Sequence, residues 1–155
     1  MNNVTPYSSM MKSLATLSSS QNLVFENISV WNDETIEQLN KLVKLRSGWD
    51  GYQAQPVSFE NAHFAMQMLQ SVCRNNTPAP QIVPGVSGDL QIEWHTLDSD
   101  VELHVLAPNH VNASFSRIGE NPIEIDLVLT FDFTTVVNWV GEIMETPIAI
   151  VAAAA

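Results

Sequence analysis

The sequence predicts an α+β fold: two N-terminal helices, an antiparallel meander of four or five strands, and a C-terminal helix packed on one sheet face. Three observations predict it. Apolar residues recur at helical spacing up to Arg74, alternate with polar residues after Pro80, and return to helical spacing after Asp132. Helices and strands that are grouped along the chain, rather than interleaved, are typical of the α+β class.

The first helix is expected over Glu34–Ser47. Asn32 or Asp33 offers an N-cap, and Gly48 is a natural C-terminal stop. The apolar stripe of this helix consists of Ile36, Leu39, Leu42 and Val43. The preceding segment, Leu23–Trp31, alternates imperfectly, which indicates either a short strand or an extended lead-in.

Two further helices are expected over Phe59–Arg74 and Phe133–Met144, with N-caps at Ser58 and Asp132. The inward face of the earlier helix is predicted to be Ala62, Ala65, Met66, Leu69, Val72 and Cys73. That of the later helix is predicted to be Val137, Val140 and Met144, with Trp139 beside them.

Five segments between these helices have the two-residue period of strands. They are Gln81–Val83, Asp89–His95, Val101–Leu106, Val111–Phe115 and Ile123–Phe131. Pro147–Val151 is also apolar and extended in character, so it could add an edge strand in this chain or in a partner.

The chain has 155 residues, a length typical of one domain. We expect that domain over residues 22–151, between a flexible tail at 1–21 and a short tail at 152–155. The single cysteine, Cys73, excludes a disulfide within the chain, and no apolar run approaches the ~18 residues of a membrane span. These features predict a soluble cytoplasmic protein that does not bind membranes.

The formal net charge is −11, and it is concentrated in one half of the chain. Residues 75–155 contain eleven acidic residues and one basic residue, Arg117. Such a surface repels phosphate backbones and attracts basic groups, so it argues against direct nucleic-acid binding and favours a partner with a basic surface. The alternative interpretation is that the charge serves solubility alone.

The hairpin formed by residues 90–106 can be worked out further. Its apolar residues share one face if the loop tip lies at Asp98-Ser99. In that register Trp94 faces Leu103 on the neighbouring strand.

On the other face of this hairpin, the same register places Glu93 opposite His104 and His95 opposite Glu102. Two Glu–His pairs could ligate a divalent metal, act as an acid–base cluster or sense pH. The alternative is a solvated face on which each cross-strand pair contributes about 0.2–1 kcal/mol. Flat strand pairs seldom bring metal ligands to one point, so we predict neither a metal nor a cofactor.

Two aromatics flank an acid in the turn Gly48-Trp49-Asp50-Gly51-Tyr52. Trp49 could close the seam between the first two helices and the sheet, because a large aromatic must pack somewhere. Alternatively the turn is a binding loop, in which Trp49 and Tyr52 anchor a partner and Asp50 pairs with a base of that partner.

Catalytic motifs are absent from the sequence. Cys73 lies on an apolar helix stripe, where free cysteine is usually core, and Ser87 lacks the glycine spacing of a nucleophile elbow. No phosphate-binding glycine loop, HExxH or CxxC pattern occurs. We therefore predict no catalytic residue.

Two short motifs resemble those of a loose group of small uncharacterised bacterial proteins. The first is the WDGY-type turn at Trp49–Tyr52, and the second is a G-x-x-x-I-E-W-like strand from Gly88 to Trp94. The resemblance covers Gly48–Leu106. It implies a bacterial or phage origin and a helix-then-sheet unit, and it assigns no site residue.

These observations favour a non-enzymatic protein that binds a basic protein partner, in the manner of an antitoxin, an immunity protein or a phage inhibitor. The expected binding residues are Trp49, Asp50, Tyr52, Glu93, His95, Glu102 and His104. One alternative is a small metal-dependent or acid–base enzyme that uses the Glu/His face. Another is a self-assembling subunit, for example a homodimer that pairs through Pro147–Val151.

Overall fold

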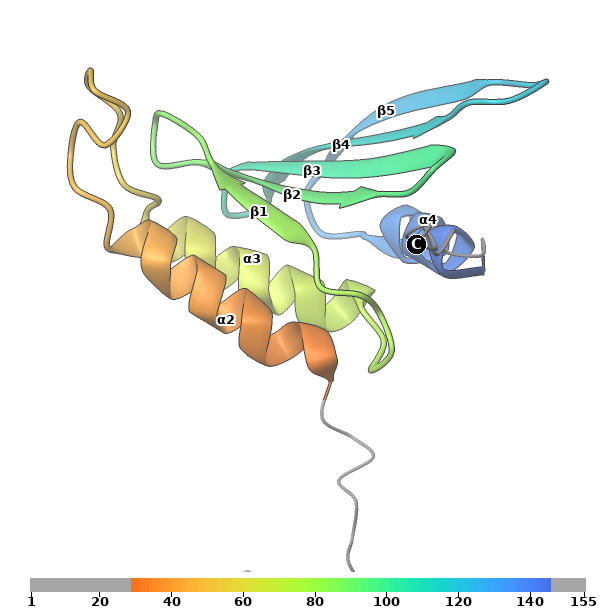
Figure 1. The fold of residues 1–155 in the computed structure, drawn as a ribbon, viewed down its shortest axis with the longest axis horizontal. Helices are drawn as coiled ribbons and strands as arrows, with labels where there is room; N and C mark the ends of the chain where they lie inside the picture. Colours follow the sequence, from red (N-terminus) through yellow and green to blue (C-terminus); the bar gives the residue numbers. More distant parts are fainter. Residues whose placement is uncertain (1–28, 146–155) are drawn as a thin grey trace, which may run out of the picture.

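The computed structural model describes residues 29–145 (Figure 1). Its helices are α2 (Val30–Val43), α3 (Phe59–Val72) and α4 (Thr134–Glu145). Its strands are β1 (Gln81–Pro84), β2 (Leu90–His95), β3 (Ser99–Ala107), β4 (His110–Arg117) and β5 (Ile123–Leu129). The two predicted tails, most of the predicted lead-in Leu23–Trp31 and the predicted edge segment Pro147–Val151 lie outside the described residues.

The predicted fold class is confirmed. The five strands form one antiparallel sheet in the order β1-β2-β3-β4-β5, which is a simple meander. All three helices lie on one side of this sheet, so its other side is uncovered by any described element (Figure 1). None of the described helices is long and apolar enough to cross a bilayer.

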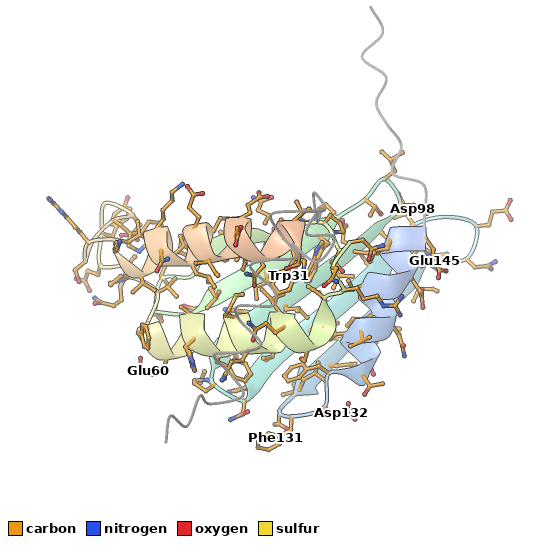
Figure 2. The ribbon with its side chains drawn as sticks, turned by 90° about the horizontal axis from the view of Figure 1, so that it is seen from below. Trp31, Glu60, Asp98, Phe131, Asp132 and Glu145 are labelled. Carbon is orange, nitrogen blue, oxygen red and sulfur yellow. The ribbon has the colours of Figure 1, made fainter. Side chains whose placement is uncertain are left out.

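The core lies between the three helices and the sheet. Alternate residues of the three central strands point into it and are buried: Leu90, Ile92, Trp94, Val101, Leu103, Val105, Val111, Ala113 and Phe115. Leu69 of α3 and Val140 of α4 meet them from the helical layer, which Figure 2 shows from the helix side. Because successive strand residues point to opposite faces, the residues that lie between these buried ones point to the uncovered side of the sheet.

The first helix begins and ends four residues earlier than predicted, at Val30 and Val43 instead of Glu34 and Ser47. Trp31 explains the early start, because it is 4% exposed and its indole N–H donates to the carbonyl oxygen of Arg74 at 3.0 Å. Burying this side chain inside a helical turn outweighs the local capping preference of the residues that follow it.

The second helix starts as predicted, since the Ser58 hydroxyl accepts a hydrogen bond from the Asn61 N–H at 3.1 Å. Its buried face contains Met68 where Met66 was expected, and Met66 is only half-buried. Cys73 is also half-buried beside the core, and burial raises its thiol pKa to about 12, which leaves the sulfur inert at neutral pH.

The third helix buries Val136, Trp139, Val140 and Ile143. The predicted inward residues Val137 and Met144 are only partly buried at the edge of this face. The Asp132 carboxylate accepts a hydrogen bond from the Thr134 N–H at 2.9 Å, as expected of a residue at the start of a helix.

The β2–β3 hairpin has a different register from the predicted one. Trp94 lies opposite Val101 rather than Leu103, and Leu103 lies opposite Ile92. The shift is two residues, so the apolar side chains still share one face, as predicted. Every cross-strand partner on the solvent face, however, changes.

The tip of this hairpin is responsible for the shift. The Thr96 hydroxyl donates to the Ser99 carbonyl oxygen at 2.8 Å and accepts from the Ser99 N–H at 3.0 Å. The Thr96 N–H also donates to that carbonyl at 2.8 Å. Thr96 and Ser99 therefore close the turn around residues 97–98, not around Asp98-Ser99.

Candidate interaction face

The uncovered side of the sheet, here called the open face, carries acidic residues and two histidines but no lysine or arginine. Its acids, from β2 to β5, are Glu93, Asp100, Glu102, Glu124 and Asp126. Arg117 is the one lysine or arginine in the five strands, and it belongs to the helix side. Its guanidinium contacts Glu142 of α4 at 2.8 Å and lies 5.2 Å from the Phe115 ring centre. The open face is therefore a negatively charged surface.

Strand register aligns three of these acids in one row across the sheet. Glu93 lies opposite Glu102, Glu102 opposite Ser114, and Ser114 opposite Asp126. Like charges that lie directly opposite on neighbouring strands are destabilising. The sheet thus holds a repulsive arrangement that its own folding does not require.

The predicted Glu93–His104 and His95–Glu102 pairs are wrong. The two-residue register shift places Glu93 opposite Glu102 and His95 opposite Asp100. The four predicted side chains do share the open face, but the two histidines form their contacts with other carboxylates.

His95 lies between two carboxylates. Its Nε2 is 3.0 Å from Oε2 of Glu93, and its Nδ1 is 2.8 Å from Oδ1 of Asp100. Hydrogen bonds to Glu93 and Asp100 raise the pKa of His95 above its ordinary value. Both ring nitrogens face acceptors, which suits the imidazolium, because only that form donates from both nitrogens.

His104 is held by Asp89 in the turn between β1 and β2. Its Nε2 bonds to Oδ2 of Asp89, whose Oδ1 accepts from the Ser87 N–H at 2.9 Å. Partial burial acts to raise the pKa of Asp89, but the bonds from His104 and Ser87 together hold it below the ordinary value. A Cβ on Gly85 would lie 2.1 Å from Oδ2 of Asp89, so glycine makes room for this carboxylate.

A shallow hollow of about 450 Å³ lies on the open face between β2 and β5. Polar side chains line it, among them Glu102, His104, Asn112, Ser114 and Asp126. The carboxylates of Glu102, Glu124 and Asp126 accept no hydrogen bond and form no ion pair within residues 29–145. They are available to a cationic group from outside.

The carboxylates of this face do not converge on one point. Within the part of the chain that the structure describes, no three His, Cys, Asp or Glu side chains are placed to hold a metal ion together. What the open face offers is a set of separate carboxylates on a rigid sheet, which can each meet one ammonium or guanidinium group.

The aromatic turn lies apart from these acids, where backbone bonds join it to the β1–β2 turn. The Gln55 N–H donates to the Val86 carbonyl oxygen at 2.9 Å. Trp49 is half-buried and lies outside the core, and its indole N–H donates to the Gln55 carbonyl oxygen at 3.0 Å. Trp49 therefore fixes its own loop and does not close a seam between helices and sheet.

Asp50 is also occupied within this turn. Its Oδ1 accepts from the N–H groups of Tyr52 at 2.9 Å and Ala54 at 3.1 Å, while Gly48 and Gly51 supply the positive φ angles the turn needs. Tyr52, at 86% exposed, is the one aromatic of the turn that projects freely.

The sequence analysis missed four acids that complete the site: Asp89, Asp100, Glu124 and Asp126. The alternation of Ile123–Leu129 already places Glu124 and Asp126 together on the face opposite the isoleucines. Which face that is, and which acids of β3 they accompany, follows only from the β4–β5 register.

Comparison with protein-family models, with curated proteins and with solved structures found no match to this chain. The resemblance carried by the WDGY-type turn accordingly stays a prediction, and the function has to be argued from the site itself.

Proposed function

We propose that this protein is a non-enzymatic interaction module whose open face binds a basic surface of a protein partner in the cytoplasm. Antitoxins, immunity proteins and phage inhibitors act in this manner. The observation that carries the proposal is the row in which Glu93 and Glu102 lie directly opposite each other with Asp126 in line.

This row is unfavourable in the isolated protein and favourable in a complex. A basic partner removes the repulsion between Glu93 and Glu102 and supplies ion pairs to carboxylates that have no partner among the described residues. Complementary charge also accelerates association and selects among partners. The same field repels phosphate backbones, which argues against nucleic acid as the ligand.

The test compares two variants that change net charge equally. The open-face variant combines Glu102→Gln, Glu124→Gln and Asp126→Asn, which removes three carboxylates without breaking any internal hydrogen bond described above. In affinity capture from a lysate of the source organism, quantified by mass spectrometry, the wild type should retain a basic protein. The open-face variant should retain at least about tenfold less of that protein.

The matched control combines Asp33→Asn, Glu34→Gln and Glu60→Gln on the helix side, where Figure 2 shows Glu60 at the start of α3. These three side chains are exposed, and the control should capture the same protein as the wild type. Equal loss in both variants would mean that only net charge matters. Undiminished capture by the open-face variant would exclude the open face as the binding site.

A further inference from the structure

The two edges of the sheet differ in a way that indicates how a partner binds. At the β1 edge, the Gln38 carboxamide of α2 occupies two of the outward backbone groups. Its Nε2 donates to the Pro80 carbonyl oxygen at 3.3 Å, and its Oε1 accepts from the Ile82 N–H at 3.2 Å. This side chain imitates a neighbouring strand, so the β1 edge is closed.

The β5 edge has no such cover. β5 is the last strand of the sheet. Within residues 29–145, no other strand pairs with its outer side and no side chain bonds to it. Its register with β4 is continuous over seven residues, without a bulge, and it contains neither proline nor lysine. Natural edges are usually protected by such features or by charged side chains, because a bare edge is a template for another strand. The charges on β5, Glu124 and Asp126, are both acidic, so they disfavour an acidic strand and favour a basic one.

The apolar layer is also incomplete at this edge. The helix side of β5 carries Ile123, Ile125, Leu127 and Leu129, and none of them is fully buried. Leu127 and Leu129 pack partly against the core, whereas Ile123 and Ile125 remain 39% and 37% exposed. An added strand with apolar residues on this side would cover them.

The open-face side of β5 indicates which side chains an added strand would carry on that side. Glu124 and Asp126 point there, and neither has a partner within residues 29–145. Basic side chains on a neighbouring strand would lie directly opposite them at cross-strand contact distance. A second copy of β5 fits poorly, since antiparallel pairing about the strand centre would bring Asp126 against Asp126.

We propose that an extended segment of the basic partner adds to β5 as a sixth strand, and that its residues alternate between Lys or Arg and a β-branched or aliphatic residue. This inference rests on the proposed function and adds the binding mode. Main-chain hydrogen bonds to the β5 edge supply affinity, and the two alternating side-chain sets supply specificity.

The test uses synthetic peptides, so no partner needs to be identified. A fluorescent nonapeptide that alternates Lys and Val should bind the whole protein, with anisotropy as the readout. A peptide of equal composition with its Lys and Val residues in separate blocks should bind at least about tenfold more weakly. So should a fully N-methylated alternating peptide, which keeps every charge but donates no main-chain hydrogen bond.

Two isoleucine variants localise the effect. Ile125→Lys places a charge on the helix side of β5, and Ile118→Lys makes the same change in the β4–β5 loop, where Ile118 is 68% exposed. Ile125→Lys should weaken the alternating peptide at least tenfold, and Ile118→Lys less than about twofold. Amide exchange at residues 123–129 should slow when the alternating peptide is added.

The outcomes separate this inference from the proposed function. Equal binding of all three peptides overturns strand addition. So does lysate capture that survives Ile125→Lys but is abolished in the open-face variant. Both results are compatible with the proposed binding by the acidic face. Capture unaffected by the open-face variant overturns the proposed function itself. Slow exchange of the outward-pointing β5 amides in the free monomer shows that this chain already covers the edge, and so does a dimer that Ile125→Lys dissociates. Either result overturns the partner strand.

Discussion

His95 is the residue whose charge state the open face controls most directly. Glu93 and Asp100 hold its two ring nitrogens, and both carboxylates favour the imidazolium. The imidazolium in turn reduces the repulsion around Glu93. His95 is therefore a titratable counter-charge within an acidic surface.

Titration of His95 should show this directly. Because hydrogen bonds to Glu93 and Asp100 raise its pKa, the NMR midpoint of its ring protons should lie above the ordinary value of 6.5. Asp100→Asn should lower that midpoint, whereas Asp33→Asn on α2 should leave it unchanged. An Asp100→Asn midpoint equal to that of the wild type would contradict the bridging role.

The sign of the pH dependence follows from the raised pKa. Stability from His95 is fully present below the unfolded pKa and is lost as pH rises through the folded pKa. The side chain is nearly half exposed, so this contribution is at most about 1 kcal/mol. The open face accordingly becomes more negative, and more strongly attractive to a basic partner, as the pH rises through the raised pKa of His95.

Among the elements, the β1–β2 turn connects the site to its scaffold. The Asp89 carboxylate lies against Gly85, accepts a hydrogen bond from the Ser87 N–H and bonds to His104 of β3. The turn is thus both a loop closure and the support of one site residue. Its geometry depends on a glycine that has no φ requirement of its own, only a lack of space for a Cβ.

Gly85→Ala should therefore release His104. The new methyl group would overlap the Asp89 carboxylate, whose three outer atoms lie 2.1–2.3 Å from it, so the carboxylate must rotate away from His104 and Ser87. We expect a loss of about 1–2 kcal/mol in the free energy of unfolding, measured by urea denaturation. Gly141→Ala on α4, which has no neighbour within 4 Å, is the control. Unchanged His104 chemical shifts in Gly85→Ala would contradict this role.

The elements also show what sequence can and cannot predict. The spacing of apolar residues located all three helices and all five strands, because burial on one face imposes a period that local sequence records. The start of α2 depends instead on Trp31 reaching the Arg74 carbonyl, 43 residues away. The hairpin register depends on how Thr96 and Ser99 share hydrogen bonds. Neither interaction leaves a periodic signal.

The candidate site divides in the same way. Alternation alone placed Glu93, His95, Glu102 and His104 on one face, and the structure agrees. Their partners could not be predicted, because a two-residue slip keeps every residue on its face and changes everything opposite to it.

At the scale of the whole molecule, charge is segregated between two layers. The five bases within residues 29–145 lie in the helical layer, in the segments adjoining it or, for Arg117, against α4, while the open face carries acids. The two surfaces of the protein therefore differ in charge: the open face is suited to a basic partner, and the helix side is of mixed charge.

Binding by the open face should compete with stability. Glu102→Gln removes the repulsion with Glu93, so it should raise the free energy of unfolding by about 0.2–1 kcal/mol while weakening partner capture. Urea denaturation measures the first effect, and Glu34→Gln on α2 should change stability by less than about 0.5 kcal/mol. A Glu102→Gln protein that is less stable than the wild type would show that the carboxylate row is not repulsive.

The closed β1 edge has a consequence for assembly. A sheet with two bare edges can accept a strand on each side, and molecules joined in that way grow into open-ended polymers. Gln38 occupies one of the two edges here, so growth that begins at β5 has nowhere to continue. Strand addition of the kind proposed above would therefore stop at one strand for each molecule of this protein, with a stoichiometry of one to one.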